Sequence, residues 1–325
     1  MNKKVAFICP LYDMKNHFDL AFNLYKSKID LSINEDIYFV FSDEEQKEKF
    51  RKRVKDAFKK EISFLILPAE ELHYKSKVTV KKFFALRSLM LDYNYLSIID
   101  SESLFVKKVD FCDLFEEIWN EGTCLNCNIS PDGFFILRKC FRTMSVKLYN
   151  NKTLRKEFDN FRYNLWFNEI PVYKCDTLPS FFKWLDTFDE EGYKNEWNCY
   201  EYYIYAAYLL LLEGRHLKKF PEIVSNGGVM EYLFERPIEE QQKILDTIGT
   251  HWSSNGKVTN SKTCMLFHLD RTEGEGNYSF GINKEYIIKM KIVRIRLILK
   301  DFITDYLPGG DKIINFTKKL IHKDK

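Results

Sequence analysis

Four short apolar runs, and the helical segments between them, organise the amino-terminal part of the chain. Each run is bounded by polar residues or a proline, which is typical of buried strands: 5–9, 37–41, 62–67 and 95–99. Between the runs, helical spacing of apolar residues and one charged stretch predict helices at about 18–27, 44–60 and 79–91. The order β-α-β-α-β-α-β predicts a parallel, doubly wound sheet and hence an α/β protein.

The turn after the second predicted strand carries a helix-start signal. Ser42 and Asp43 precede Glu44 and Glu45, so a capping side chain is followed by an acidic first turn. This pattern predicts that a Lys/Arg-rich helix starts there and extends to about Lys60.

Beyond residue 100 the pattern is less regular. Helices are predicted at 111–119 and 200–213, and the second is strongly apolar and ends before Gly214. Strands are predicted at 134–137, 165–173 and 263–269. Because no internal repeat or low-complexity linker divides this part, we expect one mixed α/β domain over residues 1–282.

The segment 283–325 differs from the rest and is predicted to be a basic, helical extension. On a helix, one apolar stripe contains Ile288, Ile292, Ile295, Leu299 and Phe302. The cations beside it are Lys284, Lys289, Lys291, Arg294, Arg296 and Lys300. Such a helix can bind an anionic membrane surface, and the alternative is a helix packed on the domain with its lysines in water.

Composition and missing motifs exclude several classes of protein. Hydrophobic residues make up 45% and charged residues 30% of 325 residues, so a packed core is expected, and a net charge of +3 argues against a nucleic-acid binder. There is no GxGxxG after the first strand and no P-loop motif. The eight cysteines have no framework spacing, the longest apolar block is too short to span a bilayer, and no cleavage site follows the start. We therefore expect a cytoplasmic protein with reduced thiols.

Candidate chemistry is concentrated where the fourth predicted strand ends, at Asp100-Ser101-Glu102. Ligands of open α/β sheets bind at the carboxyl ends of strands, and on a regular strand Asp100 and Glu102 would point to one face. Two carboxylates aimed at one point favour a hard divalent cation that also contacts a diphosphate. The alternative is a strand that ends in a polar turn, with Asp100 or Ser101 capping the next segment.

These parts together resemble the GT-A class of nucleotide-sugar glycosyltransferases. The shared features are the β-α-β-α-β-α-β half, the Asp-x-Asp-like motif, a mixed second half and a late histidine, His268. Within that class, segments 81–86, 95–102 and 166–173 are similar to enzymes of bacterial capsule and lipooligosaccharide gene clusters. The resemblance covers residues 1–280 in pattern and is most specific over 82–102. Asp-Ser-Glu stands in place of Asp-x-Asp, and the longer Glu102 changes the geometry that a metal would meet.

The resemblance implies roles for the matching residues. Residues implied to hold the nucleotide-sugar are Pro10, Leu11, Tyr12, Ser42, Asp43, Lys82 (or Lys81) and Ser101, with Trp166, Asn168 and Glu169 at the sugar. Mn²⁺ or Mg²⁺ would be held by Asp100, Glu102 and His268. Each role has a structural alternative: Ser42 and Asp43 cap a helix, Lys82 is solvated, and His268 is a hydrogen-bonded core residue.

Transfer of a sugar with inversion also needs a general base for the acceptor hydroxyl. The candidate carboxylates are Asp186, Glu190, Glu191, Glu196 and Glu201. We place Glu201 and Asp186 first, since Glu201 opens an aromatic-rich helix that suits sugar rings. Asn198 and Glu201 also have the spacing of a capping box, which would be purely structural.

The sequence therefore predicts a metal-dependent GT-A glycosyltransferase with a nucleotide-sugar donor, first of all a UDP-sugar. The expected acceptor is a bacterial surface glycan, free or lipid-linked, reached from the inner face of the cytoplasmic membrane. One alternative is a nucleotide-sugar nucleotidyltransferase, which would need a basic, glycine-rich loop where residues 10–15 stand. The other is an inactive, membrane-associated protein that binds sugar nucleotides.

Overall fold

The computed structural model describes part of the chain in two compact units, Met1–Asn277 and Tyr278–Lys325. The described residues are 4–11, 17–101, 103–105, 107–121, 123–124, 127–128, 140–154, 156, 164–165, 171–196, 199–218, 224–226, 265–267, 292, 295, 296, 299 and 303. The predicted domain boundary at 282/283 lies outside them and stays a prediction.

A five-stranded sheet in the order β3-β2-β1-β4-β9 forms the centre of the first unit. Four of its strands are parallel: β1 (Val5–Pro10), β2 (Asp36–Phe41), β3 (Ser63–Ile66) and β4 (Tyr95–Ile98). The fifth, β9 (Val172–Lys174), pairs antiparallel with β4. The predicted α/β class, with a parallel Rossmann-like half in a mixed sheet, is confirmed.

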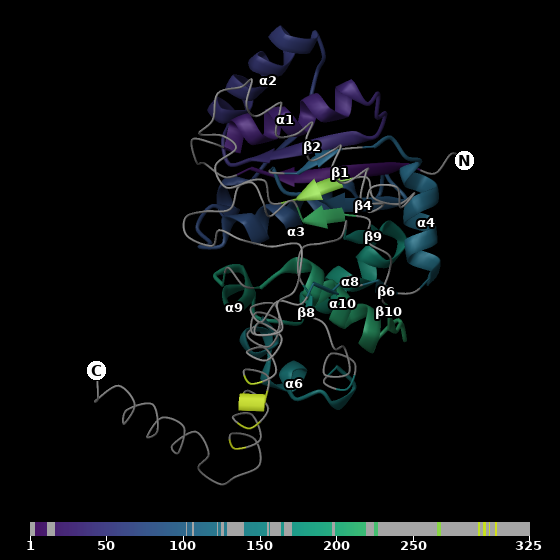
Figure 1. The fold of residues 1–325 in the computed structure, drawn as a ribbon. Helices are drawn as coiled ribbons and strands as arrows, with labels where there is room; N and C mark the ends of the chain where they lie inside the picture. Colours follow the sequence, from purple (N-terminus) through teal and green to yellow (C-terminus); the bar gives the residue numbers. More distant parts are fainter. Residues whose placement is uncertain are drawn as a thin grey trace. The chain divides into compact units, whose positions relative to one another are not determined.

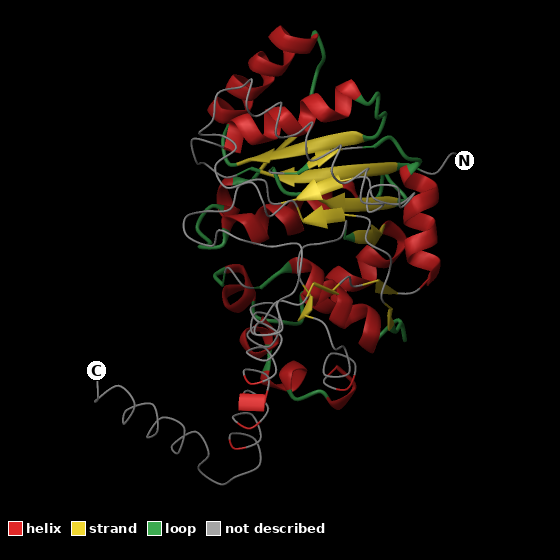
Figure 2. Ribbon diagram, in the orientation of Figure 1, coloured by secondary structure: helices red, strands yellow, loops and turns green. Residues whose placement is uncertain are grey.

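Helices cover both faces of this sheet (Figures 1 and 2). The helices α1 (His17–Asp30) and α2 (Glu44–Phe58) lie on one face, and α3 (Lys77–Leu89) lies on the other. The chain passes from β1 through α1 to β2 and from β2 through α2 to β3, and then returns through α3 to β4 on the other side of β1. This reversal of direction places α3 on the opposite face and produces the doubly wound arrangement. The helix α4 (Phe111–Glu121) follows where the sequence predicts it.

The rest of the first unit has shorter elements. Helical ones are η1 (Ala69–Glu71), α6 (Val146–Tyr149), η2 (Cys175–Thr177), α8 (Leu178–Leu185), α9 (Glu190–Lys194) and α10 (Glu201–Leu211). Short paired strands are β5 (Leu104–Phe105), β6 (Thr123–Cys124), β7 (Cys127–Asn128), β8 (Asn164–Leu165), β10 (Leu217–Lys218), β11 (Val224–Asn226) and β12 (Met265–Phe267).

The strand predicted at 165–173 is wrong as one element. Its two ends belong to different sheets, since β8 pairs with β7 and β9 pairs with β4. The polar residues in the middle of the segment had already interrupted the apolar pattern there. The strand predicted at 134–137 lies outside the described residues.

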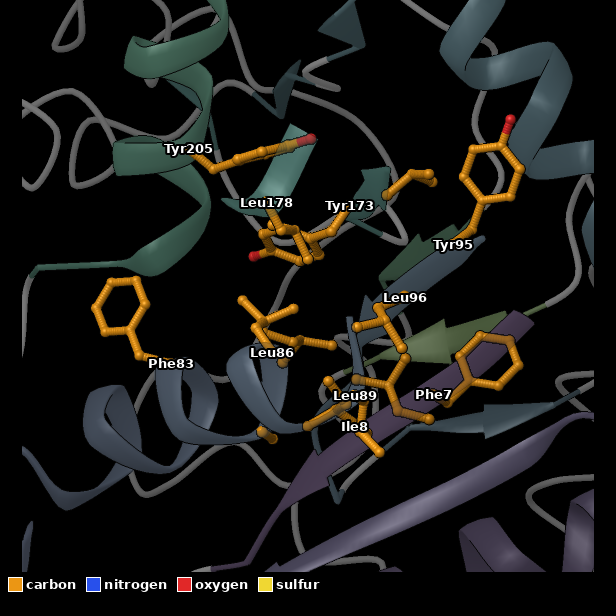
Figure 3. Close-up of a cluster of buried hydrophobic side chains, with 14 of the residues drawn as sticks. Phe7, Ile8, Phe83, Leu86, Leu89, Tyr95, Leu96, Tyr173, Leu178 and Tyr205 are labelled. Atoms are coloured by element: carbon orange, nitrogen blue, oxygen red, sulfur yellow. The ribbon is translucent and has the colours of Figure 1, made fainter. Parts of the chain in front are cut away.

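The core joins the sheet to α3 and α10. Leu86 and Leu89 of α3 face Ile8 of β1 and Leu96 of β4 (Figure 3), and all four are buried. On the far side of α3, nine of the eleven residues of α10 are buried. Burial of apolar surface on this scale is the main stabilising contribution to a fold of this size.

Three findings bear on the chain's environment. Among the described residues, no helix has the length and apolar character that crossing a membrane requires. The cysteines whose side chains are described, at 9, 112, 140, 175 and 199, are free thiols. In the second unit, the described positions of the predicted stripe, Ile292, Ile295 and Leu299, are helical and exposed.

Candidate functional site

Three parallel strands end at one edge of the sheet, and predicted site residues follow each end. The register pairs Pro10 of β1 with Val40 of β2, and Ile8 with Ile98 of β4. Backbone hydrogen bonds continue past the strands, from the Leu11 N–H to the Val40 carbonyl (3.0 Å) and from the Ile99 N–H to the Ile8 carbonyl (2.8 Å). Leu11, Ser42 and Asp100 therefore lie at the carboxyl edge, where open α/β sheets bind ligands.

Asp100 stands in a turn and not on the strand. The strand β4 ends at Ile98, and the Ser103 N–H donates to the Asp100 carbonyl at 3.0 Å. The two-residue periodicity of a strand therefore does not apply at Asp100, and the expectation that Glu102 points to the same side stays a prediction. The turn itself agrees with the polar-turn alternative. Asp100 is partly exposed, whereas Ser101 is buried.

Of the predicted metal ligands, only Asp100 lies among the described residues; Glu102 and His268 do not. Within the described part of the chain, no three His, Cys, Asp or Glu residues are grouped as a metal site. The strands that adjoin Glu102 and His268 in the sequence, β5 and β12, are nevertheless described. The strand β12 ends at Phe267 and pairs antiparallel with β5, with Leu266 opposite Leu104.

The cap predicted at the start of α2 is confirmed. Asp43 is the N-cap, and its carboxylate accepts a hydrogen bond from the Gln46 N–H at 2.8 Å. Ser42 is buried, and its hydroxyl has no hydrogen-bond partner among the residues that the structure describes. Of this pair, Asp43 thus has a structural role at the sheet edge, and Ser42 offers an uncommitted hydroxyl.

Both lysines of the predicted phosphate-binding pair are buried on α3. The Lys82 ammonium pairs with the Glu201 carboxylate at 3.1 Å, and each side chain is only 5% exposed. The Lys81 ammonium donates to the Leu11 carbonyl at the end of β1. The alternative of a solvated Lys82 is therefore wrong, because its charge meets a carboxylate from α10.

Glu201 is the first residue of α10, and the predicted capping box does not form. The N-cap is Tyr200, which makes no side-chain capping bond, so Glu201 stands too early in the helix for that motif. Its carboxylate pairs with Lys82 instead. Nothing local in the sequence signals this partner, since Lys82 belongs to another helix.

Glu201 has uncharged polar neighbours as well. Burial raises the pKa of the Tyr173 hydroxyl, and the nearby Glu201 carboxylate raises it further. Burial likewise raises the pKa of the Cys140 thiol, with contributions from Cys199 and Glu201. Both groups are therefore protonated beside the Lys82–Glu201 salt bridge. No local sequence pattern indicates this cluster, which assembles from separate segments.

The other predicted base, Asp186, is exposed and lies at the end of α8. Its carboxylate pairs with Arg87 of α3, whose guanidinium stacks 4.1 Å from the ring centre of Phe182. The secondary candidates Glu190 and Glu191 contact Tyr74 and Asn195 respectively. Tyr12, Trp166, Asn168 and Glu169 lie outside the described residues.

Comparisons of sequence give no assignment: no protein-family model and no curated protein matches the chain. Comparisons of structure give weak likenesses. Core-mannan synthase A from Aspergillus fumigatus, in its Mn/GDP form, has 13% identity and a TM-score of 0.41 over 68% of this chain and 73% of its own. Mouse xyloside xylosyltransferase 1, in its apo form, has 9% identity and a TM-score of 0.40 over 86% and 99%. A mannosyltransferase from S. cerevisiae has 10% identity and a TM-score of 0.35 over 60% and 62%.

Proposed function

We propose that the protein is a metal-dependent GT-A glycosyltransferase that transfers a sugar from a nucleotide-sugar, first of all a UDP-sugar. The observation that carries the proposal is the antiparallel pairing of β12 with β5, the strand that follows the turn at Asp100. The strand β5 begins two residues after Glu102, and β12 ends one residue before His268. Segments far apart in the sequence thus bring the neighbours of two predicted ligands together, next to the turn that carries Asp100.

The donor set suits a hard divalent cation. Asp100 is partly exposed at a ligand-binding edge, and a second carboxylate and an imidazole complete a set that Mn²⁺ accepts readily and Mg²⁺ less so. We propose that Asp100, Glu102 and His268 hold this ion. When bound, the metal would act as a Lewis acid that stabilises the negative charge on the departing diphosphate.

The chain's own groups would position the donor and acceptor. The ends of β1 and β2, at Pro10–Tyr12 and Ser42–Asp43, are proposed to contact the base and ribose. Ser101 is proposed to lie near the diphosphate, and Trp166, Asn168 and Glu169 near the sugar. Of the two leading base candidates, Asp186 is the exposed one.

The acceptor is proposed to be a bacterial surface glycan presented at the cytoplasmic membrane. The supporting observation is the exposure of Ile292, Ile295 and Leu299, with Arg296 also exposed. Apolar side chains beside cations suit an anionic membrane surface. Binding of the protein to anionic vesicles should therefore be lost at high salt. It should also be lost when Gln replaces four cations of the segment: Lys289, Arg294, Arg296 and Lys300. Sedimentation with anionic vesicles measures both.

The experiment that tests the site is calorimetry of UDP binding with and without Mn²⁺, in the wild type and in Asp100→Asn. The variant keeps the size of the side chain and removes the charge, so metal-dependent affinity should disappear while the fold is retained. Unchanged Mn²⁺-dependent affinity would contradict the metal role. Hydrolysis of a panel of nucleotide-sugars then separates a glycosyltransferase from an inactive binding protein. Production of nucleotide-sugar and pyrophosphate from a sugar phosphate and a nucleoside triphosphate would indicate the nucleotidyltransferase.

A further inference from the structure

Adjacent lysines of α3 contact two different parts of the molecule. Lys81 donates to the Leu11 carbonyl at the end of β1, and Lys82 pairs with Glu201 at the start of α10. Successive residues of a helix point about 100° apart, so neighbouring side chains can serve different faces. One turn of α3 thereby connects the carboxyl edge of the sheet to α10.

We propose that Lys81 and Lys82 form a brace that fixes the start of α10 relative to the nucleotide edge, and that Glu201 is a positioning residue which acts through Lys82. This inference rests on the proposed function, since that function makes the edge at Leu11 a nucleotide site. It assigns Glu201 a role different from the general base expected from the sequence.

Burial of the pair is the first argument for positioning. A general base must come within hydrogen-bond reach of the acceptor hydroxyl. The Glu201 side chain is 5% exposed and already bonded to Lys82 at 3.1 Å. Moving it toward an acceptor would leave an ammonium buried without its carboxylate, which is costly in a protein interior. Asp186, in contrast, is exposed.

The surroundings of Glu201 are the second argument. Its carboxylate acts on Tyr173 of β9 and on Cys140 in addition to Lys82. The strand β9 pairs with β4, and the turn after β4 carries Asp100. Glu201 therefore contacts α3, whose Lys81 reaches Leu11, and lies near β9, which pairs with β4.

The test compares three variants: Glu201→Gln, Lys82→Met and the double variant Lys82→Met/Glu201→Leu. Each single change leaves one buried charge without the opposite charge, whereas the double change replaces the pair by apolar groups of similar size. The affinity for UDP with Mn²⁺ should fall about tenfold in each single variant and return to within about twofold in the double variant. Turnover of the nucleotide-sugar should follow the same order.

Hydrogen exchange gives a readout that needs no ligand. The Leu11 N–H donates to the Val40 carbonyl, so its protection reports the end of β1. Both single variants should lose protection at Leu11 and in the first turn of α10, and the double variant should recover it.

A matched control is the buried lysine of α9. The Lys194 ammonium pairs with Glu71 at 3.0 Å, and its side chain is 8% exposed, but the pair joins α9 to η1. Lys194→Met should therefore lower stability without changing protection at Leu11 or affinity for UDP.

Two results would overturn the brace. Unchanged protection at Leu11 in both single variants would show that the pair acts only locally. A double variant with wild-type protection and UDP affinity, but turnover reduced by about a hundredfold or more, would make Glu201 the base. A wild type that binds neither UDP nor Mn²⁺ would instead refute the proposed function, and hydrogen exchange would still decide on the brace.

Discussion

The helices α2 and α10 both pack on the core of the first unit, but they use charge in opposite ways. Along α2, ion pairs such as Lys49 with Glu45 are exposed to water, and the buried residues are few. Along α10, Glu201 is the only charged residue, and it is paired in the interior. In α2, therefore, most charges are expected to contribute little to stability, with the buried Lys47 as the exception.

Solvation explains the difference. When two exposed charges pair, each gives up favourable contacts with water for its contact with the other charge. The net contribution to the stability of the fold is therefore small. A buried charge has already lost its water, so removal of its partner leaves an uncompensated charge. The number of ion pairs on a helix therefore says little about how much they stabilise the fold. The burial of each pair says much more.

The largest effect is expected at α10. Glu201→Ala should lower the free energy of unfolding by about 3–5 kcal/mol, because it leaves the Lys82 ammonium buried and unpaired. Urea denaturation followed by circular dichroism measures this. A loss no larger than that of an exposed pair would show that Lys82 reaches water or another partner, and the contrast between the helices would fail.

A second effect concerns alkaline pH and again sets α10 apart. Burial raises the pKa of the Tyr208 hydroxyl to about 12, and its hydrogen bond to Glu213 contributes. An unfolded tyrosine ionises near pH 10, so the stabilisation is complete below about pH 10 and is lost between about 10 and 12.

The measurement is the free energy of unfolding across that pH range, in the wild type and in Tyr208→Phe. The wild type should lose stability more steeply than the variant, which has no phenol to ionise at this position. Equal slopes would mean that Tyr208 titrates as an exposed tyrosine.

A smaller effect is expected at the cap of α2. Asp43→Ala removes the carboxylate that accepts the Gln46 N–H and should cost about 1 kcal/mol. Asp43→Asn keeps an oxygen acceptor and should cost much less. Urea midpoints without nucleotide measure the difference, and identical midpoints for the two variants would contradict the cap.

The same two helices show what the sequence can predict. The start of α2 was predictable because its signal is local: Asp43 precedes an acidic turn and caps it by reaching three residues along the chain. The apolar body of α10 was predictable from composition for the same reason.

The pairing of Glu201 was not predictable, because Lys82 becomes its neighbour only when α3 and α10 pack together. The turn at Asp100 was missed for a related reason. An apolar run shows that a strand exists, but it does not show where the ladder ends, and β4 stops at Ile98. Placement of Asp100 at the carboxyl edge nevertheless followed from the strand order alone.

The smallest effect is expected for the exposed pair of α2, and it is the sharpest check on the contrast. Glu45 and Lys49 are hydrogen-bonded one helical turn apart, with side chains 76% and 68% exposed. The pairing lowers the pKa of Glu45, yet water screens both charges, and ordering two long side chains offsets their attraction. Glu45→Gln and Lys49→Gln, alone or together, should therefore leave the urea midpoint unchanged within error at moderate salt. A double-mutant cycle on this pair should give no measurable coupling, whereas the cycle on Lys82 and Glu201 should give a large one. If the exposed pair couples as strongly as the buried one, burial does not decide which charges stabilise this fold.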